Sequence, residues 1–258
     1  MKKAIVIGAS SGIGREIARL LIADGWTVGV AARREELLEK LRTEAAATPH
    51  QVKTAQIDVT SVEAPQQLRQ LISQLGGIDL FFYAAGIGKV NRELLPDIEQ
   101  ATVDTNCNAF TRMVGEAYRY FAEQSVERQK NGGQAQGGSH IAAITSIAGT
   151  KGMGPAPSYS ATKAMQNVYL QALEQQANAR RLNIRFTDIR PGFVDTDLLN
   201  DDFHYPMMLQ PEAVAKEIVS AIRKQQHIRV IDWKYRLLTA LWRRIPRWMW
   251  RRMWLTAS

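Results

Sequence analysis

The sequence predicts one α/β domain with a doubly wound, seven-stranded parallel sheet and a C-terminal amphipathic helical extension. Three observations lead to this fold class. The 258 residues suit one large domain, and 45% of them are hydrophobic, which is enough to build a core. Short apolar runs alternate with segments of helical spacing, as in parallel sheets covered by helices. Because no linker or repeat divides the chain, we expect one domain over 1–232, followed by the extension at 233–258.

Seven runs are predicted to be strands. The first, Lys3 to Ile7, is short and rich in β-branched residues, as expected for a strand that is buried on both faces. The third alternates in polarity and ends at Asp58. The seven predicted strands are 3–7, 26–31, 51–57, 78–83, 140–145, 184–189 and 228–231.

Helices are predicted between these strands. The first begins at Gly12, and its apolar residues Ile13, Ile17, Leu20 and Leu21 share one face. Residues 131–138 are polar, glycine-rich and aperiodic, which predicts a surface loop. The predicted helices are 12–23, 34–47, 64–75, 104–129, 158–179 and 211–224.

The net charge of +8 is concentrated at the C-terminus. Residues 233–258 contain seven basic and no acidic residues, so the first 232 residues carry a net charge of only +1. This distribution argues against a generally basic, nucleic-acid-binding body. The single cysteine, Cys107, excludes an intrachain disulfide framework and fits a reducing compartment. No apolar run reaches the length of a membrane-spanning helix. The four histidines have no ligand spacing, so we predict no metal site.

The basic extension also holds five of the six tryptophans. Its apolar residues recur at helical spacing on one broad face, and Pro246 is expected to kink or end the helix. Arginine and tryptophan on an amphipathic helix favour peripheral contact with an anionic membrane. The alternatives are docking on the body or on a partner subunit and, with less support, binding of single-stranded nucleic acid. The predicted apolar face comprises Leu237, Leu238, Leu241, Trp242, Ile245, Trp248 and Met249.

A glycine-rich turn links the first predicted strand to the first helix. Gly8, Gly12 and Gly14 allow a tight turn and close approach of a pyrophosphate, and the helix N-terminus offers free N–H donors. The segment therefore predicts a dinucleotide site, with a purely structural turn as the alternative.

Two arginines end the second predicted strand, at the position that distinguishes NAD from NADP. A carboxylate there would bind the ribose 2′-hydroxyl of NAD, whereas arginine binds the 2′-phosphate of NADP. Arg33 and Arg34 precede the first acidic residue, Glu35, so NADP is favoured. The alternative is a pair of solvated charges, although a helix N-terminus is an unfavourable place for cations.

A tyrosine and a lysine are spaced for chemistry on one helix face. Tyr159 and Lys163 lie one turn apart, and a nearby ammonium is expected to lower the phenol pKa toward neutrality. Ser146 follows a predicted strand, where ligands bind in doubly wound sheets. An ordinary surface pair is the alternative for the tyrosine and lysine alone.

Taken together, these residues resemble the short-chain dehydrogenase/reductase family, whose fold is of the Rossmann type, over about residues 1–232. The resemblance implies hydride transfer at a nicotinamide ring, with Tyr159 as the acid in carbonyl reduction or the base in alcohol oxidation. Further residues that match the family are Asp58, Val59, Ala85, Gly86, Asn106, Pro191, Gly192 and Thr196.

The resemblance also implies individual roles. Lys163 would hold the nicotinamide ribose and lower the phenol pKa, Ser146 would bind the substrate oxygen, and Asn106 would position a water that relays protons to Lys163. Asp58 would contact the adenine, and the segment from Pro191 to Thr196 would line the nicotinamide pocket. The implied catalytic residues are Asn106, Ser146, Tyr159 and Lys163; the implied cofactor-binding residues are Gly8, Ser10, Ser11, Gly12, Ile13, Gly14, Arg33, Arg34, Asp58, Val59, Ala85, Gly86, Asn106, Tyr159, Lys163, Pro191, Gly192, Val194 and Thr196.

Two positions depart from the family pattern. Tyr83 and Ala84 replace two asparagines whose side chains would form hydrogen bonds, and Ile7 replaces a threonine before the first glycine. The segment 193–210, with Phe203, Tyr205, Met207 and Met208, is predicted to be a mobile lid with an apolar wall, or else a plain surface loop.

We therefore expect an NADP(H)-dependent reductase of a ketone, lipid-like if the extension binds a membrane. Alcohol oxidation and a non-catalytic NADP-binding sensor or scaffold are the alternatives. The family also implies a homodimer or homotetramer. We expect a cytoplasmic location, at the inner face of a membrane if the extension binds one.

Overall fold

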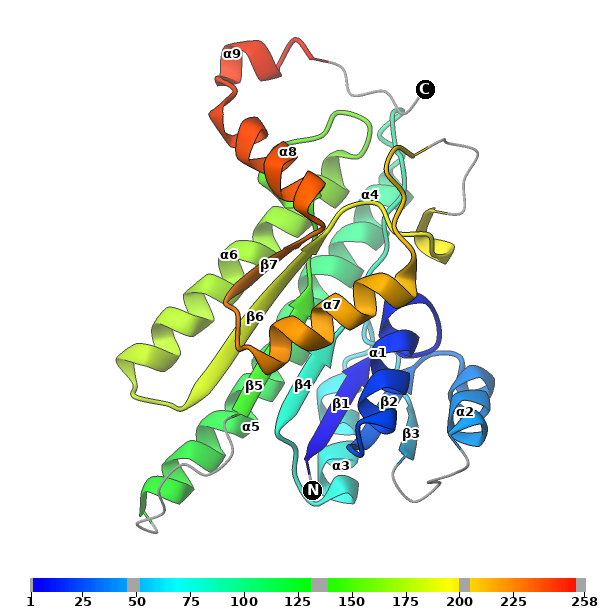
Figure 1. The fold of residues 1–258 in the computed structure, drawn as a ribbon, viewed down its shortest axis with the longest axis vertical. Coiled ribbons are helices and arrows are strands. Elements are labelled where there is room, and N and C mark those ends of the chain that lie inside the picture. Colours follow the sequence, from blue (N-terminus) through cyan, green and yellow to red (C-terminus); the bar gives the residue numbers. More distant parts are fainter. Residues whose placement is uncertain (1, 46–51, 131–138, 200–204, 254–258) are drawn as a thin grey trace.

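A seven-stranded, all-parallel sheet forms the centre of the molecule (Figure 1). The structure is a computed structural model that describes residues 2–45, 52–130, 139–199 and 205–253. The strand order is β3-β2-β1-β4-β5-β6-β7, which confirms the predicted doubly wound sheet. The strands are β1 (Lys3–Ile7), β2 (Thr27–Ala32), β3 (Val52–Gln56), β4 (Leu80–Tyr83), β5 (Ser139–Ile144), β6 (Ile184–Pro191) and β7 (Ile228–Ile231).

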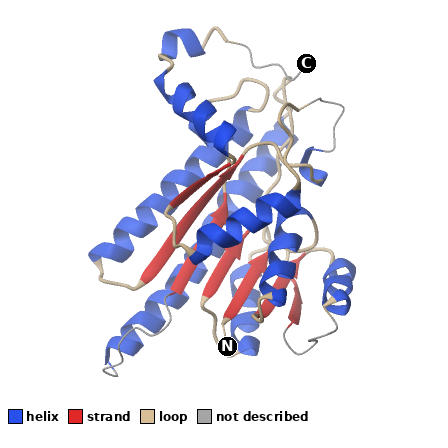
Figure 2. Ribbon diagram, viewed as in Figure 1, coloured by secondary structure: helices blue, strands red, loops and turns tan. Residues whose placement is uncertain are grey.

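Helices cover both faces of this sheet (Figure 2). One face packs against α1 (Gly12–Ala23), α2 (Glu35–Glu44) and α7 (Pro211–Arg223). The other packs against α3 (Ala64–Leu75), α5 (Phe110–Lys130) and α6 (Pro157–Ala179). Burial of both faces explains why the central strands read as continuous apolar runs.

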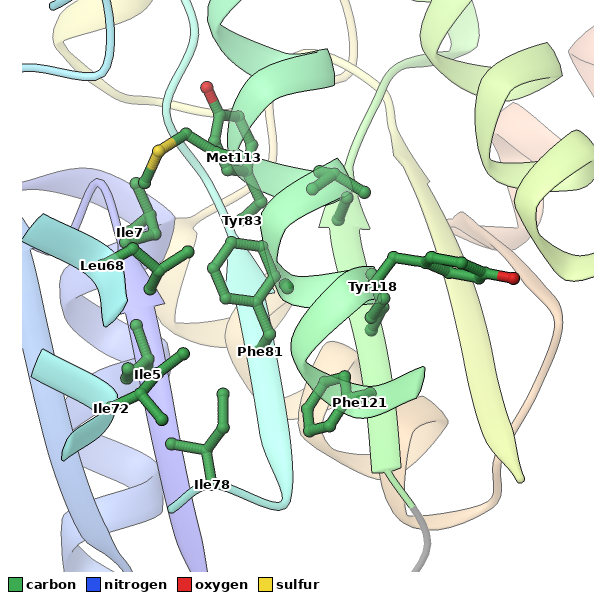
Figure 3. Close-up of a cluster of buried hydrophobic side chains, with 14 of the residues drawn as sticks. Ile5, Ile7, Leu68, Ile72, Ile78, Phe81, Tyr83, Met113, Tyr118 and Phe121 are labelled. Carbon is green, nitrogen blue, oxygen red and sulfur yellow. The ribbon is translucent and has the colours of Figure 1, made fainter. Parts of the chain in front are cut away.

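The core is centred on β1 and β4, as Figure 3 shows. Ile5 and Ile7 point to one face with Phe81 and Tyr83, where they meet Leu68 and Ile72 of α3 and Met113 and Phe121 of α5. Alternate residues, such as Val6 and Phe82, point to the other face. Each fully buried side chain of this size contributes roughly 1.5–3 kcal/mol. This packing fixes the carboxyl ends of the strands, where the motif residues lie.

The helix predicted at 104–129 is longer and interrupted. It is preceded by α4 (Pro96–Val103), passes through a π-helical turn, η2 (Asp104–Ala109), and continues as α5. The start of α4 escaped prediction because this helix is largely exposed and buries only Thr102 fully. The loop predicted at 131–138 lies outside the described residues, as do residues 46–51 and 200–204.

The C-terminal extension forms α8 (Trp233–Arg244) and the short α9 (Arg247–Trp250), which extend beyond the sheet at its carboxyl edge (Figure 1). Pro246 separates them, as predicted. Of the predicted apolar face, Leu237, Leu241, Trp248 and Met249 are exposed, and the other three members are partly buried. Tyr235 and Thr239, which the prediction did not include, are buried against the body. No helix in the described part of the chain combines the length and apolar character needed to cross a bilayer.

Candidate active site

The glycine turn between β1 and α1 is closed so tightly that side chains would not fit. Gly8 has φ +85°, and a Cβ there would lie 2.7 Å from the main-chain nitrogen of Ala85. A Cβ on Gly14 would lie 2.2 Å from the carbonyl oxygen of Gly8. Gly12 has φ +53° and faces Thr196, whose methyl group would be 3.0 Å from a Cβ. The turn therefore brings the predicted residues Gly8, Gly12, Gly14, Ala85 and Thr196 together.

Arg34 lies beside this turn. Its guanidinium donates to the hydroxyls of Ser10 and Ser11, over 3.1 and 2.8 Å. It also lies 3.9 Å from Asp197 in an exposed ion pair, which contributes little stability. Ser11 precedes α1, whose first N–H groups are free to bind an anion, and Ile13 packs beneath the turn. A cation, two hydroxyls and a helix N-terminus thus converge at one place.

Arg33, unlike Arg34, lines a hollow of about 330 Å³. The hollow is also lined by Gln56, Asp58 and Gln67. Hydrogen bonds from Thr60 to the Asp58 carboxylate, with the nearby charge of Arg33, keep the pKa of that carboxyl below its ordinary value. Val59 is buried and lines no part of the hollow. A larger hollow of about 740 Å³, lined by residues of α5 and Arg180, contains none of the motif residues.

One buried atom in this hollow has no partner within the described residues. The side-chain oxygen Oε1 of Gln67 is buried and accepts no hydrogen bond. The glycine turn is the stronger sign of a cofactor, because side chains on Gly8 and Gly14 would close a cradle that adjoins the Arg34 guanidinium, two hydroxyls and a helix N-terminus. The residues present therefore fit the phosphates of a dinucleotide.

Asn106 is fully buried in the π-helical turn η2. Its side chain accepts from the Ile87 N–H over 2.9 Å and donates to the Ile87 carbonyl over 2.7 Å. A third hydrogen bond, of 3.2 Å, reaches Thr162 on α6. A Cβ on Gly86 would lie 3.3 Å from the Asn106 Oδ1 and 3.5 Å from the Lys163 Nζ, so Gly86 leaves room at the centre of the site.

Ser146, Tyr159 and Lys163 meet beside Asn106. Ser146 follows β5, and its hydroxyl lies close enough to the half-buried Tyr159 to act on the phenol pKa. The Lys163 Nζ lies 5.7 Å from the centroid of the Tyr159 ring. A Cβ on Gly88 would be 2.7 Å from this ring, so Gly88, which the sequence did not single out, makes room for the phenol. The structure thus brings the four predicted catalytic residues together.

The phenol pKa differs from the prediction. Burial raises the Tyr159 pKa, and the nearby Ser146 hydroxyl only partly opposes this effect. The predicted fall toward neutrality is wrong for the structure as it stands, because the cost of burying a phenolate outweighs the favourable contacts. Burial lowers the Lys163 pKa to about 8, against the opposing charges of Asp188 and Cys107. At neutral pH the site therefore holds a protonated phenol and a charged ammonium.

The segment after β6 completes the site. Pro191 ends the strand, and the main-chain N–H of Gly192 bonds to the Ile231 carbonyl. Val194 is buried, and Thr196 faces Gly12 as described above. Within the predicted apolar wall, the Tyr205 ring packs at a tilt against Phe193, with the two ring centroids 4.8 Å apart. Met207 and Met208 are exposed. Phe203 lies outside the described residues.

Three further contributors, besides Gly88, were missed at the sequence level. Gln166, fully buried on α6, contacts Lys163 and Asn106. Asp188 is a buried carboxylate on β6 that bonds to Arg190 and Thr145; the only signal for it was an acid within an apolar strand. Tyr235 of α8 is fully buried against Gly192, where a Cβ would be 2.1 Å from the ring. Tyr235 lies in the extension at 233–258, and no sequence motif connects it to the site.

Residues 2–205 match the family described as short chain dehydrogenase. An uncharacterized oxidoreductase of Myxococcus xanthus is 32% identical over 213 residues, which cover 81% of this chain and 79% of the relative.

Solved structures share the fold. The actinorhodin polyketide ketoreductase with NADPH is 25% identical, with a TM-score of 0.72 over 89% of this chain and 95% of the other. The 3-ketoacyl-(acyl-carrier-protein) reductase of Brucella melitensis with NADH is 19% identical, with a TM-score of 0.75 over 90% and 96%. The first is a complex with NADPH and the second with NADH, so fold similarity leaves the choice between the two nucleotides to the residues of this chain.

Proposed function

Because the chain belongs to the short-chain dehydrogenase family of oxidoreductases, we propose that it uses NADPH to reduce a ketone to a secondary alcohol. The observation that carries the proposal is the clustering of Tyr159 and Lys163 on α6 with Ser146 at the carboxyl end of β5. NADPH, when bound, supplies the hydride. The protein residues orient the carbonyl and provide the proton.

The protonation of Tyr159 supports reduction. With its pKa raised by burial, the phenol is protonated at neutral pH, as a proton donor to the forming alkoxide must be. The Ser146 hydroxyl lies near the same phenol and so could bind the substrate oxygen together with it. Lys163, charged beneath the ring, offsets the negative charge left on Tyr159 after proton transfer. Alcohol oxidation is the alternative direction and would need the phenolate as base.

The two arginines support NADPH over NADH. Arg34 already holds Ser10 and Ser11, and Arg33 lies at the hollow next to Asp58. Guanidinium groups bind a phosphate through charge-assisted hydrogen bonds, whereas a 2′-hydroxyl offers no such charge. Arg33→Ala should weaken NADPH binding about tenfold or more and leave NADH binding nearly unchanged. Equal losses for the two nucleotides would refute this assignment.

The direct test is NADPH oxidation with a panel of ketones. Tyr159→Phe should lower turnover about a hundredfold or more while NADPH still binds, because only the acid is removed. A fully active variant would overturn the mechanism. NADPH binding without turnover of any ketone or alcohol would favour the non-catalytic sensor or scaffold. We expect apolar ketones to react best because Tyr205, Phe193, Met207 and Met208 line the loop after β6.

We further infer that α8 and α9 bring the enzyme to an anionic membrane surface. Trp233, Leu237 and Leu241 follow one another at every fourth position of α8 and are 64%, 57% and 54% exposed. In and after α9, Trp248, Met249 and Met253 are also exposed. None of the seven basic residues of the extension forms an ion pair with a described acidic residue. Exposed tryptophan and leucine among unpaired basic residues match the chemistry of a lipid interface.

The opposite face of the extension supports docking on the body. Besides Tyr235, the Lys151 Nζ donates to the Ile245 carbonyl over 2.9 Å, and the Trp250 indole donates to the Gly152 carbonyl over 2.8 Å. The two leading alternatives therefore concern different faces of the same segment. Self-association through the exposed face is unfavourable because it would place the basic residues of two copies against each other. A homodimer or homotetramer through another surface stays a prediction from the family.

Vesicle sedimentation tests the membrane contact. The full-length protein should sediment with vesicles that contain phosphatidylglycerol and not with pure phosphatidylcholine, and about 0.5 M salt should weaken the binding. Leu237→Glu with Leu241→Glu should abolish sedimentation, whereas Val62→Glu with Val168→Glu, the same charge change at other exposed apolar sites, should not. No binding of the unmodified protein to anionic vesicles, or equal binding by both double variants, would refute the proposal.

A further inference from the structure

Gln166 forms a bridge that the sequence did not predict. It lies on α6 three residues after Lys163 and is fully buried. Its side-chain nitrogen donates to the Asn106 main-chain carbonyl over 2.8 Å, and its side-chain oxygen accepts from the Lys163 Nζ over 3.1 Å. The orientation of this amide is determined by its partners, because a flipped amide would place N–H groups against an ammonium and an oxygen against a carbonyl.

The Gln166 bridge supplies a hydrogen-bond acceptor to the buried Lys163 ammonium and a donor to the Asn106 carbonyl. The Lys163 ammonium is almost fully buried, and its other hydrogen-bond acceptor within the described residues is the Ile144 carbonyl at 3.4 Å, which is longer and weaker. The side chain of Asn106 is already engaged with Ile87 and Thr162, and its main-chain carbonyl accepts from Gln166. Gln166 satisfies both without adding a charge.

We propose that Gln166 is a positioning residue that ties the Lys163 ammonium to the Asn106 carbonyl and occupies the place expected for a relay water. The proposal rests on the proposed function, since the role of Lys163 belongs to it. An amide has no proton to exchange in the working pH range, so this connection fixes the ammonium beneath the Tyr159 ring and does not conduct protons.

Two variants of similar length separate positioning from packing. Gln166→Met removes both hydrogen bonds but keeps the volume, and Gln166→Glu keeps an acceptor for Lys163 and adds a negative charge. If activity requires the charged ammonium, the high-pH limb of the NADPH-dependent rate should move to lower pH in Gln166→Met and to higher pH in Gln166→Glu. Turnover should fall about tenfold or more in Gln166→Met. Gln171→Glu, an exposed site on the same helix, is the matched control and should change neither.

A readout without turnover separates this proposal from the proposed function. The Lys163 pKa also governs how the free energy of unfolding changes with pH, and that profile should shift in the same directions in the two variants with no nucleotide added. If both pH profiles of Gln166→Met and Gln166→Glu match those of the unmodified protein, Gln166 only packs and the proposal is wrong. If the unfolding profiles shift but no ketone is reduced, the positioning role holds and the proposed function fails.

Discussion

Replacing Lys163 by methionine should stabilise the protein at neutral pH even though it removes a group that we propose to act in catalysis. Lys163 is 4% exposed, and burial lowers its pKa from 10.5 to about 8. At about 1.4 kcal/mol per pKa unit, the buried ammonium costs about 3 kcal/mol of unfolding free energy at pH 7. Methionine leaves the acceptors on Gln166 and Ile144 without their donor, which costs about 1 kcal/mol each. The net gain at pH 7 is therefore about 1 kcal/mol.

The sign of this difference should reverse with pH. Between about pH 8 and 10.5 the unfolded chain holds a proton on Lys163 that the folded chain has released, so the unmodified protein gains stability as the pH rises. The methionine variant has no such titration. Above pH 10.5 the two lost hydrogen bonds dominate, and the variant should be the less stable protein.

Urea unfolding at a series of pH values, followed by tryptophan fluorescence without added nucleotide, measures both curves. Taking the difference between the two proteins removes the titration of groups that do not interact with Lys163. A difference in unfolding free energy that stays constant from pH 7 to 11 would refute the reasoning, because it would show that the buried ammonium carries no electrostatic cost.

Two further predictions concern groups away from the reacting atoms. His140 is buried against Thr187, and burial lowers its pKa to about 4. The protein should therefore lose up to about 3 kcal/mol of unfolding free energy as the pH falls from 6.5 to 4, and His140→Gln should remove this loss. The same loss in the variant and the unmodified protein, measured by urea unfolding, would contradict this prediction. Tyr235→Phe removes the hydrogen bonds that order the loop after β6 through the Pro206 and Met207 carbonyls. The KM for an apolar ketone should rise several-fold while the affinity for NADPH stays the same. An unchanged KM would show that these bonds do not order the loop.

The sequence predicted the features that depend on local patterns. The run from Lys3 to Ile7 was recognisable because both faces of β1 are buried, and the spacing of Tyr159 and Lys163 alone places both on one face of α6. Gln166 could not be predicted in the same way. A glutamine one turn after a lysine is typical of a solvated helix face, and it is buried here because α6 packs against the π-helical turn around Asn106. The raised pKa of Tyr159 is likewise a product of three-dimensional burial.

The C-terminal extension was also predicted from its composition but not in its three-dimensional contacts, and those contacts reach the predicted substrate site. Its composition set it apart from the body as the carrier of nearly all the excess charge. In the structure, Tyr235 fills the space beside Gly192, where any side chain on the glycine would collide with it, and its hydroxyl donates to carbonyls of the loop that follows β6. The exposed side of the same helix presents Leu237 and Leu241. A force or a ligand that displaces α8 must therefore break contacts with the wall of the predicted substrate site. Binding that displaces α8 would therefore be coupled to the order of this wall, whereas binding through the exposed face alone would leave the wall as it is.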